Sequence, residues 1–312
     1  MSVSECYLVT GGMGCLGAWT IYHLLKEGKK VVNVDLSETR HRLKLLLSPE
    51  EEAKIAFERV DITDLEALKA CFARHQVSHV IHLAALQVPF CKANPALGAQ
   101  VNVTGTVNVF EAAKTQGIKH LSYASSIAVY GSAEDYKDSI LKANAPMKPR
   151  TLYGVYKVAN EKTARVYWLD EGMSSIALRP YTVYGLGRDQ GLTSEPSKAI
   201  LAAAKGENFQ ISFGGKMQFH YASDVARQFI SASRTPLAGA YGFCLGGVPV
   251  AVQEVADIIM RLRPKVNISV TEKRLSFPEG FEDSELRKHF DVYETPLEVA
   301  IAESLEVFAR IG

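Results

Sequence analysis

Tyr153 and Lys157 lie four residues apart, a spacing that puts two side chains on the same face of a helix. A phenol ionises near pH 10 on its own, so Tyr153 could act as a base at neutral pH only if a cation such as Lys157 stabilised the phenolate. A hydroxyl on Ser126 could hold a substrate alcohol while Tyr153 takes its proton and hydride leaves the carbon. Because about one Tyr-x-x-x-Lys is expected by chance in such a chain, the order and position of other motifs must decide whether the pair is catalytic.

A glycine-rich segment near the start of the chain has the spacing of a phosphate-binding turn. Residues 10–17 read Thr-Gly-Gly-Met-Gly-Cys-Leu-Gly, between an apolar stretch at 6–9 and an amphipathic stretch at 16–25, which indicates a strand, a tight turn and a helix. Glycines let the backbone turn sharply and approach a pyrophosphate, which then meets the N–H groups of the helix. The expected pyrophosphate contacts are Gly11, Gly14, Cys15, Leu16 and Gly17. A purely structural turn needs the same residues, so the glycines alone do not decide between the two readings.

An acidic residue follows the glycines at the distance that dinucleotide binding requires. The apolar run at 31–34 ends in Asp35, about 20 residues beyond the turn, where a carboxylate can accept both hydroxyls of the adenosine ribose. A 2′-phosphate would be repelled there. The sequence therefore predicts NAD in preference to NADP, with Arg40 near enough to keep NADP as an alternative.

Composition limits the class of partner. The chain has 312 residues, 47% of them hydrophobic, and a net charge of +1, which gives no electrostatic basis for binding nucleic acid or a membrane surface. The five cysteines are scattered, without CxxC pairs or clustered histidines, so we expect reduced thiols, no metal site and a cytoplasmic protein. The sequence shows no basic leader and no apolar stretch approaching about 18 residues, so we expect neither secretion nor a membrane span. A small molecule is the expected partner.

Apolar runs alternate with amphipathic ones as far as residue 180, which predicts a doubly wound parallel α/β sheet of the Rossmann type. Expected strands are 6–9, 31–34, 55–60, 78–83, 119–125 and 174–178. Expected helices are 16–25, 38–47, a short turn at 49–51, 63–75, 95–116 and 153–171. Beyond Arg179 the alternation loosens, and helices are expected at 195–205, 224–233, 253–262 and 296–311. We therefore expect a NAD-binding domain over 1–180 and a smaller C-terminal substrate lobe over 181–312, with the chain crossing back to the sheet.

Further motifs accompany the glycine turn and the Tyr/Lys pair. They are His82-Leu83-Ala84-Ala85, Asn102 in Asn-Val-Thr-Gly-Thr, Ser-Ser-Ile-Ala-Val-Tyr-Gly over 125–131, and Arg179-Pro180. With these motifs the chain resembles the extended short-chain dehydrogenase/reductase family, also called NAD-dependent epimerase/dehydratases, over essentially its whole length.

The resemblance implies a role for individual residues. Ser126, Tyr153 and Lys157 would be catalytic, and Asn102 would help to order the active-site helix. Pro180 and Val183 would lie against the nicotinamide. Further cofactor contacts are expected at Asp61, Ile62, Leu83, Ala84 and Ala85, beside those of the glycine turn, Asp35, Tyr153 and Lys157. Family members also pair through two helices, which implies a homodimer through the helices around 105–114 and 155–167.

Two departures from the family pattern bear on the substrate. Ile127 and Ala128 stand where dehydratases and decarboxylases carry an acid, so elimination of water is not expected. Nucleotide-sugar members carry an arginine two residues before an aromatic, where it grips the substrate pyrophosphate. Met217 stands in that place here, although Lys216 or Arg188 could compensate.

These observations predict an NAD-dependent oxidoreductase or epimerase that acts on a secondary alcohol of a sugar, or of a small sugar-derived acid or lactone. Arg188, in a glycine-bordered loop, has a fork of donors suited to a carboxylate or vicinal hydroxyls. The expected substrate contacts are Gln87, Phe90, Ser125, Ser126 and Arg188, with simple loop packing open for Gln87 and Phe90 and a surface turn open for Arg188. Two alternatives remain, a nucleotide-sugar 4-epimerase and an NAD-sensing regulatory protein. Retention of the Tyr/Lys pair argues against the regulatory protein.

Overall fold

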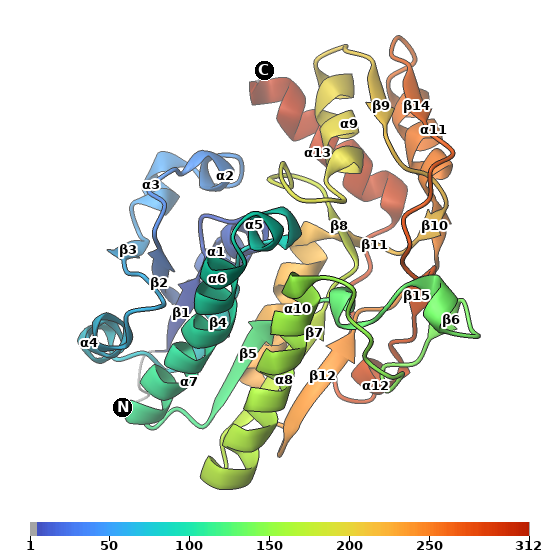
Figure 1. Cartoon of the computed structure of the whole chain (residues 1–312). Coiled ribbons are helices and arrows are strands. Elements are labelled where there is room, and N and C mark those ends of the chain that lie inside the picture. Colours follow the sequence, from blue (N-terminus) through green and yellow to red (C-terminus); the bar gives the residue numbers. More distant parts are fainter. Residues whose placement is uncertain (1–4, 312) are drawn as a thin grey trace.

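Seven parallel strands form one sheet in the computed structural model, which describes residues 5–311 (Figure 1). The strands are β1 (Cys6–Thr10), β2 (Lys30–Asp35), β3 (Ala56–Arg59), β4 (His79–His82), β5 (His120–Ala124), β7 (Ser174–Arg179) and β12 (Ala240–Cys244). Their order across the sheet is β12-β7-β5-β4-β1-β2-β3. The chain thus winds outward from β1 through β2 and β3, then returns to β4 on the other side of β1. In such sheets a crevice opens at the carboxyl ends of the strands where the order reverses.

The predicted parallel α/β sheet is confirmed, with one strand more than expected. Every residue of β1 and of β7 is buried, as in strands covered on both faces. The sequence pattern missed β12, which contains Gly242, because glycine weakens the apolar signal of a strand. A Cβ at Gly242 would lie 2.9 Å from Glu161 Oε2, so the side chains above the strand exclude a larger residue. Because β12 comes after residue 180, the chain does cross back to the sheet from the C-terminal part.

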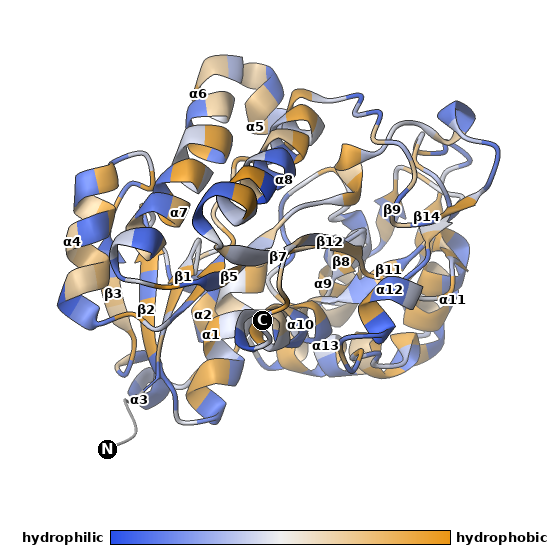
Figure 2. Cartoon of the chain, turned by 90° about the horizontal axis from the view of Figure 1, so that it is seen from below, coloured by the Kyte–Doolittle hydropathy of each residue, from blue (hydrophilic) through white to orange (hydrophobic). Residues whose placement is uncertain are grey.

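Helices cover both faces of the sheet (Figure 2). On one face lie α4 (Leu65–His75), α7 (Gly105–Thr115) and α8 (Leu152–Glu171), and on the other α1 (Cys15–Lys26) and α10 (Ala222–Arg234). Local signals set the ends of α8, where the Thr151 hydroxyl accepts a hydrogen bond from Gly154 N at 3.0 Å and Gly172 takes the left-handed conformation, with φ of +62°. These ends place Tyr153 in the first turn of α8, facing the carboxyl ends of the strands.

The helix expected over 95–116 is present but not regular. It consists of α6 (Pro95–Ala99), a π-helical segment η1 (Gln100–Thr104) and α7. The amide of Asn102, in η1, is bound on both sides by the backbone of Leu86. Wider π-helical turns are often found next to functional sites, and here the segment lies beside the end of β4.

Two short helices precede β3. The helix expected over 38–47 is reduced to α2 (His41–Lys44), and α3 (Pro49–Glu52) is the short turn predicted at 49–51. Ser48 and Glu51 cap α3 reciprocally through side chain and backbone, as the Ser-Pro-Glu-Glu sequence favours.

The C-terminal part is built from short strand pairs and helices that pack against the sheet. Its elements are β8 (Thr182–Tyr184), α9 (Glu195–Ala204), β9 (Phe209–Ile211), β10 (Lys216–Met217), β11 (Phe219–Tyr221), β13 (Val250–Ala251), α11 (Val252–Leu262), β14 (Ile268–Val270), β15 (Gly280–Phe281), α12 (Ser284–Arg287) and α13 (Leu297–Ile311). The earlier part of the chain adds the short elements α5 (Val88–Ala93), which packs on α6 and α8, η2 (Ile127–Val129), η3 (Ala133–Asp135) and β6 (Ile140–Leu141), which pairs with β15. The four helices expected beyond residue 180 are present as α9, α10, α11 and α13. Among the described residues, no helix is long and apolar enough to cross a membrane.

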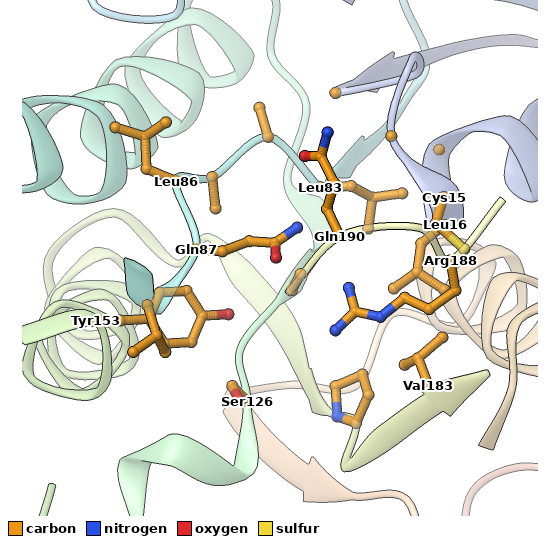
Figure 3. A pocket seen from close by; sticks show the side chains of 18 of the residues that line it. Cys15, Leu16, Leu83, Leu86, Gln87, Ser126, Tyr153, Val183, Arg188 and Gln190 are labelled. Carbon is orange, nitrogen blue, oxygen red and sulfur yellow. The ribbon is translucent and has the colours of Figure 1, made fainter. Parts of the chain in front are cut away.

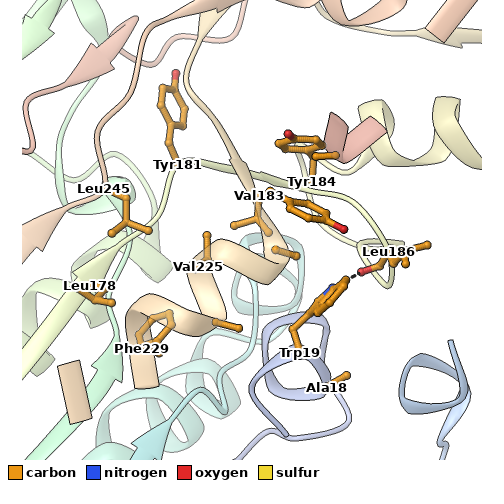
Figure 4. Close-up of a cluster of buried hydrophobic side chains, with 14 of the residues drawn as sticks. Ala18, Trp19, Leu178, Tyr181, Val183, Tyr184, Leu186, Val225, Phe229 and Leu245 are labelled. Atoms are coloured by element: carbon orange, nitrogen blue, oxygen red, sulfur yellow. Dashed lines mark hydrogen bonds between the residues drawn. The ribbon is translucent and has the colours of Figure 1, made fainter. Parts of the chain in front are cut away.

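One hydrophobic core joins this part to the sheet. Figure 4 shows Trp19 of α1 and Phe229 of α10 in the same cluster as Val183 and Tyr184 of β8. The indole N–H of Trp19 donates to the Leu186 carbonyl at 3.1 Å. The segment that follows β8 is therefore fixed over the glycine turn.

Candidate active site

A cleft of about 500 Å³ lies where the carboxyl ends of the strands meet the C-terminal part. The predicted site residues that line it are Gly11, Gly14, Cys15, Leu16, Gly17, Asp35, Asp61, Ile62, Leu83, Ala84, Ala85, Gln87, Ser125, Ser126, Tyr153, Lys157, Pro180, Val183 and Arg188. Two do not. Phe90 lies in the first turn of α5, and its side chain is exposed to solvent. Asn102 is buried behind the cleft wall.

The glycine turn has the shape that a pyrophosphate needs. Gly11 has φ of +71°, and a Cβ on Gly17 would lie 2.5 Å from Gly12 Cα, so neither position tolerates a larger residue. Gly14 directly precedes α1, and the first turn of α1 carries no acidic residue. The first N–H groups of a helix have no carbonyl of a preceding turn to accept their hydrogen bonds, so they are available to a ligand. The turn therefore fits an anionic diphosphate on a helix N-terminus.

Asp35 lies at the end of β2 beside this turn. Its Oδ2 accepts from Met13 N and its Oδ1 from Ser37 N, both at 2.9 Å. Arg40, the residue that left NADP open, is bound to Glu52 at 3.0 Å and stacks on Phe57 instead. A carboxylate beside the turn and an engaged arginine both fit a ribose with free hydroxyls.

Tyr153, Lys157 and Ser126 meet at the deep side of the cleft. The Tyr153 hydroxyl points into the open space above Ser126 (Figure 3). The Lys157 ammonium donates to the Ala124 carbonyl at 2.6 Å and lies 5.5 Å from the centre of the Tyr153 ring. The Ser126 hydroxyl accepts from Ala128 N at 3.1 Å, which leaves its own proton for a substrate oxygen.

Burial sets the ionisation of the pair. It lowers the pKa of Lys157 to about 8, so the ammonium form still dominates at neutral pH. Burial also raises the pKa of Tyr153 to about 12, although the Ser126 hydroxyl and the Arg188 cation oppose that rise. An ionised Tyr153 thus depends on the positive charges around it, as proton abstraction by a tyrosine requires.

Asn102 acts behind the wall and does not touch the cleft. Its Oδ1 accepts from Leu86 N at 2.7 Å and its Nδ2 donates to Leu86 O at 2.9 Å. The backbone carbonyl of Asn102 accepts from Asn160 Nδ2 at 2.8 Å, one turn beyond Lys157 on α8. Asn102 therefore ties the segment after β4 to the active-site helix. The contribution of Asn160 was not predicted.

A buried ion pair fixes the strand end that carries Ser126. Glu161, one turn beyond Lys157, accepts from Arg179 Nε at 2.8 Å and from Arg179 Nη2 at 2.5 Å. The Ser125 hydroxyl donates to the same carboxylate at 2.5 Å, and Arg179 Nη1 donates to the Tyr130 hydroxyl at 2.7 Å. Ser125 was expected to contact substrate, but its hydroxyl is engaged with α8. The glutamate was missed because only its partners belong to recognisable motifs.

Two polar groups that line the cleft have no hydrogen-bond partner in the part of the chain that the structure describes. They are Gln87 Oε1 and Arg188 Nε, which are both buried. A Cβ on Gly191 would lie 2.5 Å from Gln87 Oε1 and 2.8 Å from Arg188 Nη2, so the two side chains converge on the same glycine. Arg188 and Tyr153 point toward one another across the cleft (Figure 3). A substrate hydroxyl between them could donate to Gln87 Oε1 and accept from Arg188 Nε.

The position where the family resemblance implied an arginine is apolar here. Met217 is 1% exposed, and its sulfur accepts from the Thr182 hydroxyl at 3.1 Å. Lys216 is exposed, and neither residue lines the cleft. The cleft wall also includes Leu192, Thr193 and Phe277, which the sequence did not indicate because they lie in loops without a motif.

One group of potential metal ligands lies away from the cleft. The ligand atoms of Glu58, Cys71 and His75 lie within 4.8 Å of one another. Glu58 already accepts from Arg74 and from His75, and Cys71 is a core residue whose pKa is raised by burial to about 12. We interpret the group as an ion-pair cluster between β3 and α4.

Comparison with known proteins shows the family and the fold. A family model described as "NAD dependent epimerase/dehydratase family" matches residues 7–242. A UDP-glucuronate 4-epimerase of Thermodesulfobacterium geofontis is 34% identical over 270 residues, which cover 82% of this chain and 80% of that protein. A UDP-N-acetylglucosamine 4-epimerase from Methanobrevibacter ruminantium has a similar structure, with a TM-score of 0.86 at 24% identity and 99% of each chain covered. An L-threonine dehydrogenase from Clostridium difficile has the same TM-score, 0.86, at 22% identity over 99% of each chain.

Proposed function

The chain belongs to the NAD-dependent epimerase/dehydratase family, and we propose that it oxidises a secondary alcohol of a small sugar-derived acid. Membership makes it an NAD-dependent epimerase or dehydrogenase of the extended short-chain type. The choice of a small acid as substrate, and of net oxidation over epimerisation, is our proposal.

Each residue of the deep cleft has a defined task in this reaction. NAD, when bound along the glycine turn and Asp35, supplies the acceptor for hydride. The Ser126 hydroxyl holds the substrate alcohol, and Tyr153 removes its proton. The Lys157 ammonium, fixed by the Ala124 carbonyl, stabilises the phenolate that proton removal requires.

The observation that carries the proposal is the unpartnered pair Gln87 and Arg188 opposite Tyr153. A buried donor and a buried acceptor without partners are costly, and a bound ligand can supply the missing hydrogen bonds. The guanidinium fork of Arg188 matches a carboxylate in geometry and in charge. Gln87 Oε1 is an acceptor, so its partner would be a hydroxyl beside that carboxylate, as in a hydroxy acid. The reacting alcohol would then lie between this carboxylate site and Tyr153, which suits a molecule of a few carbons.

The apolar Met217 supports a substrate without a nucleotide. A thioether cannot form an ion pair with a diphosphate. Met217 is also buried and does not line the cleft, so it offers a nucleotide no contact. The structurally similar L-threonine dehydrogenase also has a name that implies a small hydroxylated acid as substrate.

A nucleotide-sugar 4-epimerase is the second candidate. It is favoured by the 34% identity to a UDP-glucuronate 4-epimerase, and it would use the same Ser126, Tyr153 and Lys157. Such an enzyme would need a cation for the pyrophosphate, and Lys216 is the nearest one in sequence to the position of Met217.

We further propose that the protein is a homodimer and works in the cytoplasm. Val155, Val166 and Leu169 of α8 are 46%, 52% and 66% exposed, which leaves an apolar stripe on the outer helix layer. A second copy of the same helix face would cover it. The five cysteines are all free thiols, which suits a reducing compartment.

Purified protein incubated with NAD and a panel of substrates tests the proposal. The panel contains aldonates, uronates, 3-hydroxy amino acids, the corresponding uncharged sugars and UDP-sugars. We expect reduced NAD to accumulate with an acid and not with its uncharged counterpart. Conversion of a UDP-sugar to its epimer without net reduction of NAD would overturn the proposal and establish the second candidate. Failure of every compound to react, with NAD still bound, would support the regulatory alternative.

Two matched variants localise the recognition. Arg188→Gln should raise KM for the acid by about 10- to 100-fold, the range for loss of a hydrogen bond to a charged group, with a smaller effect on kcat. Lys216→Gln should leave KM for the acid unchanged. The reverse pattern, with only Lys216→Gln affecting KM, would contradict a carboxylate site at Arg188.

A further inference from the structure

The loop that carries Arg188 is fastened to the cofactor side of the cleft at two points. We call residues 185–193, between β8 and α9, the substrate loop. At its first anchor, the Leu186 carbonyl accepts from Trp19 Nε1 at 3.1 Å (Figure 4) and from Cys15 Sγ at 3.6 Å. Both donors belong to α1, the helix whose N-terminus faces the phosphate turn.

The second anchor is Asp189. Its Oδ1 accepts from Arg42 Nη2 at 2.6 Å and from Arg42 Nε at 3.2 Å, and its Oδ2 is 2.9 Å from His41 Nε2. Burial alone would raise the pKa of Asp189, but the hydrogen bonds from Arg42 and His41 outweigh it and lower that pKa, so the carboxylate stays ionised. The anchor joins residues 147 positions apart in the sequence.

Arg42 also holds the glycine turn itself. Its Nη1 donates to the Met13 carbonyl at 2.7 Å, and Met13 N in turn donates to Asp35. One guanidinium therefore links the substrate loop to the segment that would bind the cofactor phosphates and ribose. Arg42 and Asp189 both line the cleft, as do Gly187 and Arg188 between the two anchors.

We propose that Arg42 and Asp189 form a latch that closes the substrate loop over bound NAD and must open for the cofactor to exchange. The loop crosses from the C-terminal part to α1 and α2. NAD held by the glycine turn and Asp35 would therefore lie beneath this loop, in the cleft that both line. The latch also fixes Arg188, the neighbour of Asp189, in the orientation that faces Tyr153. The proposed latch does not depend on the identity of the substrate, because it requires only that NAD binds.

The exposure of the pair suits a contact that opens in each cycle. The Arg42 side chain is 13% exposed and that of Asp189 is 40% exposed. A deeply buried ion pair would lock the cofactor in, whereas water can reach this one and compete for Asp189. Loss of a partly exposed charged pair should change a rate constant by about fivefold.

The dissociation rate of the reduced cofactor tests the latch without any substrate. Protein loaded with NADH is mixed in a stopped-flow instrument with excess NAD, and the fall of NADH fluorescence gives the rate constant. Asp189→Asn and Arg42→Met should each release NADH about fivefold faster than the unmodified protein. The double variant should be no faster than the faster single variant, because both changes open the same contact.

Lys44→Met is the matched control, since it removes an exposed positive charge from the same short helix and no ion pair of Lys44 is found among the described residues. It should leave the rate unchanged. Should Arg42→Met unfold because the Met13 carbonyl loses its donor, Asp189→Asn tests the latch alone, with thermal unfolding of both proteins as the check. Release within twofold of the unmodified rate in Asp189→Asn, or effects that add in the double variant, would overturn the latch.

Discussion

Replacing Lys157 with methionine should move the pH dependence of catalysis upward. The Lys157 ammonium lies 5.5 Å from the centre of the Tyr153 ring and is almost completely buried. With this distance taken as the separation of the two charges and an effective dielectric constant of about 20, a unit positive charge stabilises a phenolate by about 3 kcal/mol, which corresponds to about two pKa units. Removal of the cation raises the pKa of Tyr153, so a higher pH is needed to ionise it. The acid limb of kcat/KM should therefore shift to higher pH by about two units.

The assay follows the absorbance of reduced NAD across the pH range in which both proteins stay folded, with an acid from the panel that gives turnover. Lys162→Met is the control, because Lys162 is exposed on the same helix and does not line the cleft. It should leave the acid limb in place. An unchanged acid limb in Lys157→Met, with only a lower plateau, would refute the electrostatic role of this lysine.

Three further changes test other parts of the structure. Asp35→Ala should narrow the preference for NAD over NADP by about tenfold or more, chiefly by improving NADP binding, because a repelling carboxylate is removed. If the ratio of the dissociation constants of NADP and NAD were the same in the variant and in the unmodified protein, this expectation would be wrong. Glu161→Gln leaves Arg179 buried without its charge partner and should lower the free energy of unfolding in urea by about 3–5 kcal/mol, whereas a loss below about 1 kcal/mol would show that the pair is not needed. Light scattering should give a mass of twice 34.2 kDa, and Val166→Glu should give the monomer mass; a monomer before the substitution would contradict the proposed dimer.

Much of the fold could be predicted because its signals are local. The glycine turn, the β-branched runs and the caps of α8 each act within a few residues of the chain. The strand β12 and the π-helical segment η1 could not be predicted in this way. Gly242 reflects the Arg179–Glu161 pair packed above it, and the winding of η1 accompanies the bonds of Asn102 to Leu86. Both depend on contacts between segments far apart in the sequence.

The same distinction separates the parts of the candidate site. Residues in motifs, such as Asp35 and Tyr153, were located by order and spacing. Glu161 and Asp189 were not singled out, because an isolated acidic residue on a helix or in a loop is ordinary until its partner is known. Phe90 was assigned to the pocket from its position after β4, but the first turn of α5 points it to solvent. The direction of a side chain just beyond a strand depends on the following turn, which the sequence pattern left open.

The turnover of Tyr153→Phe tests the central claim most directly. The change removes one hydroxyl from the cleft and should leave folding and NAD binding intact. Loss of a general base typically lowers the rate by 10²- to 10⁴-fold, and we expect kcat to fall within about that range. Tyr156→Phe is the control, since its hydroxyl donates to the Pro95 carbonyl and it does not line the cleft, and it should keep its turnover. If Tyr153→Phe kept more than about a tenth of the original turnover, a loss far below that range, Tyr153 would not be the base.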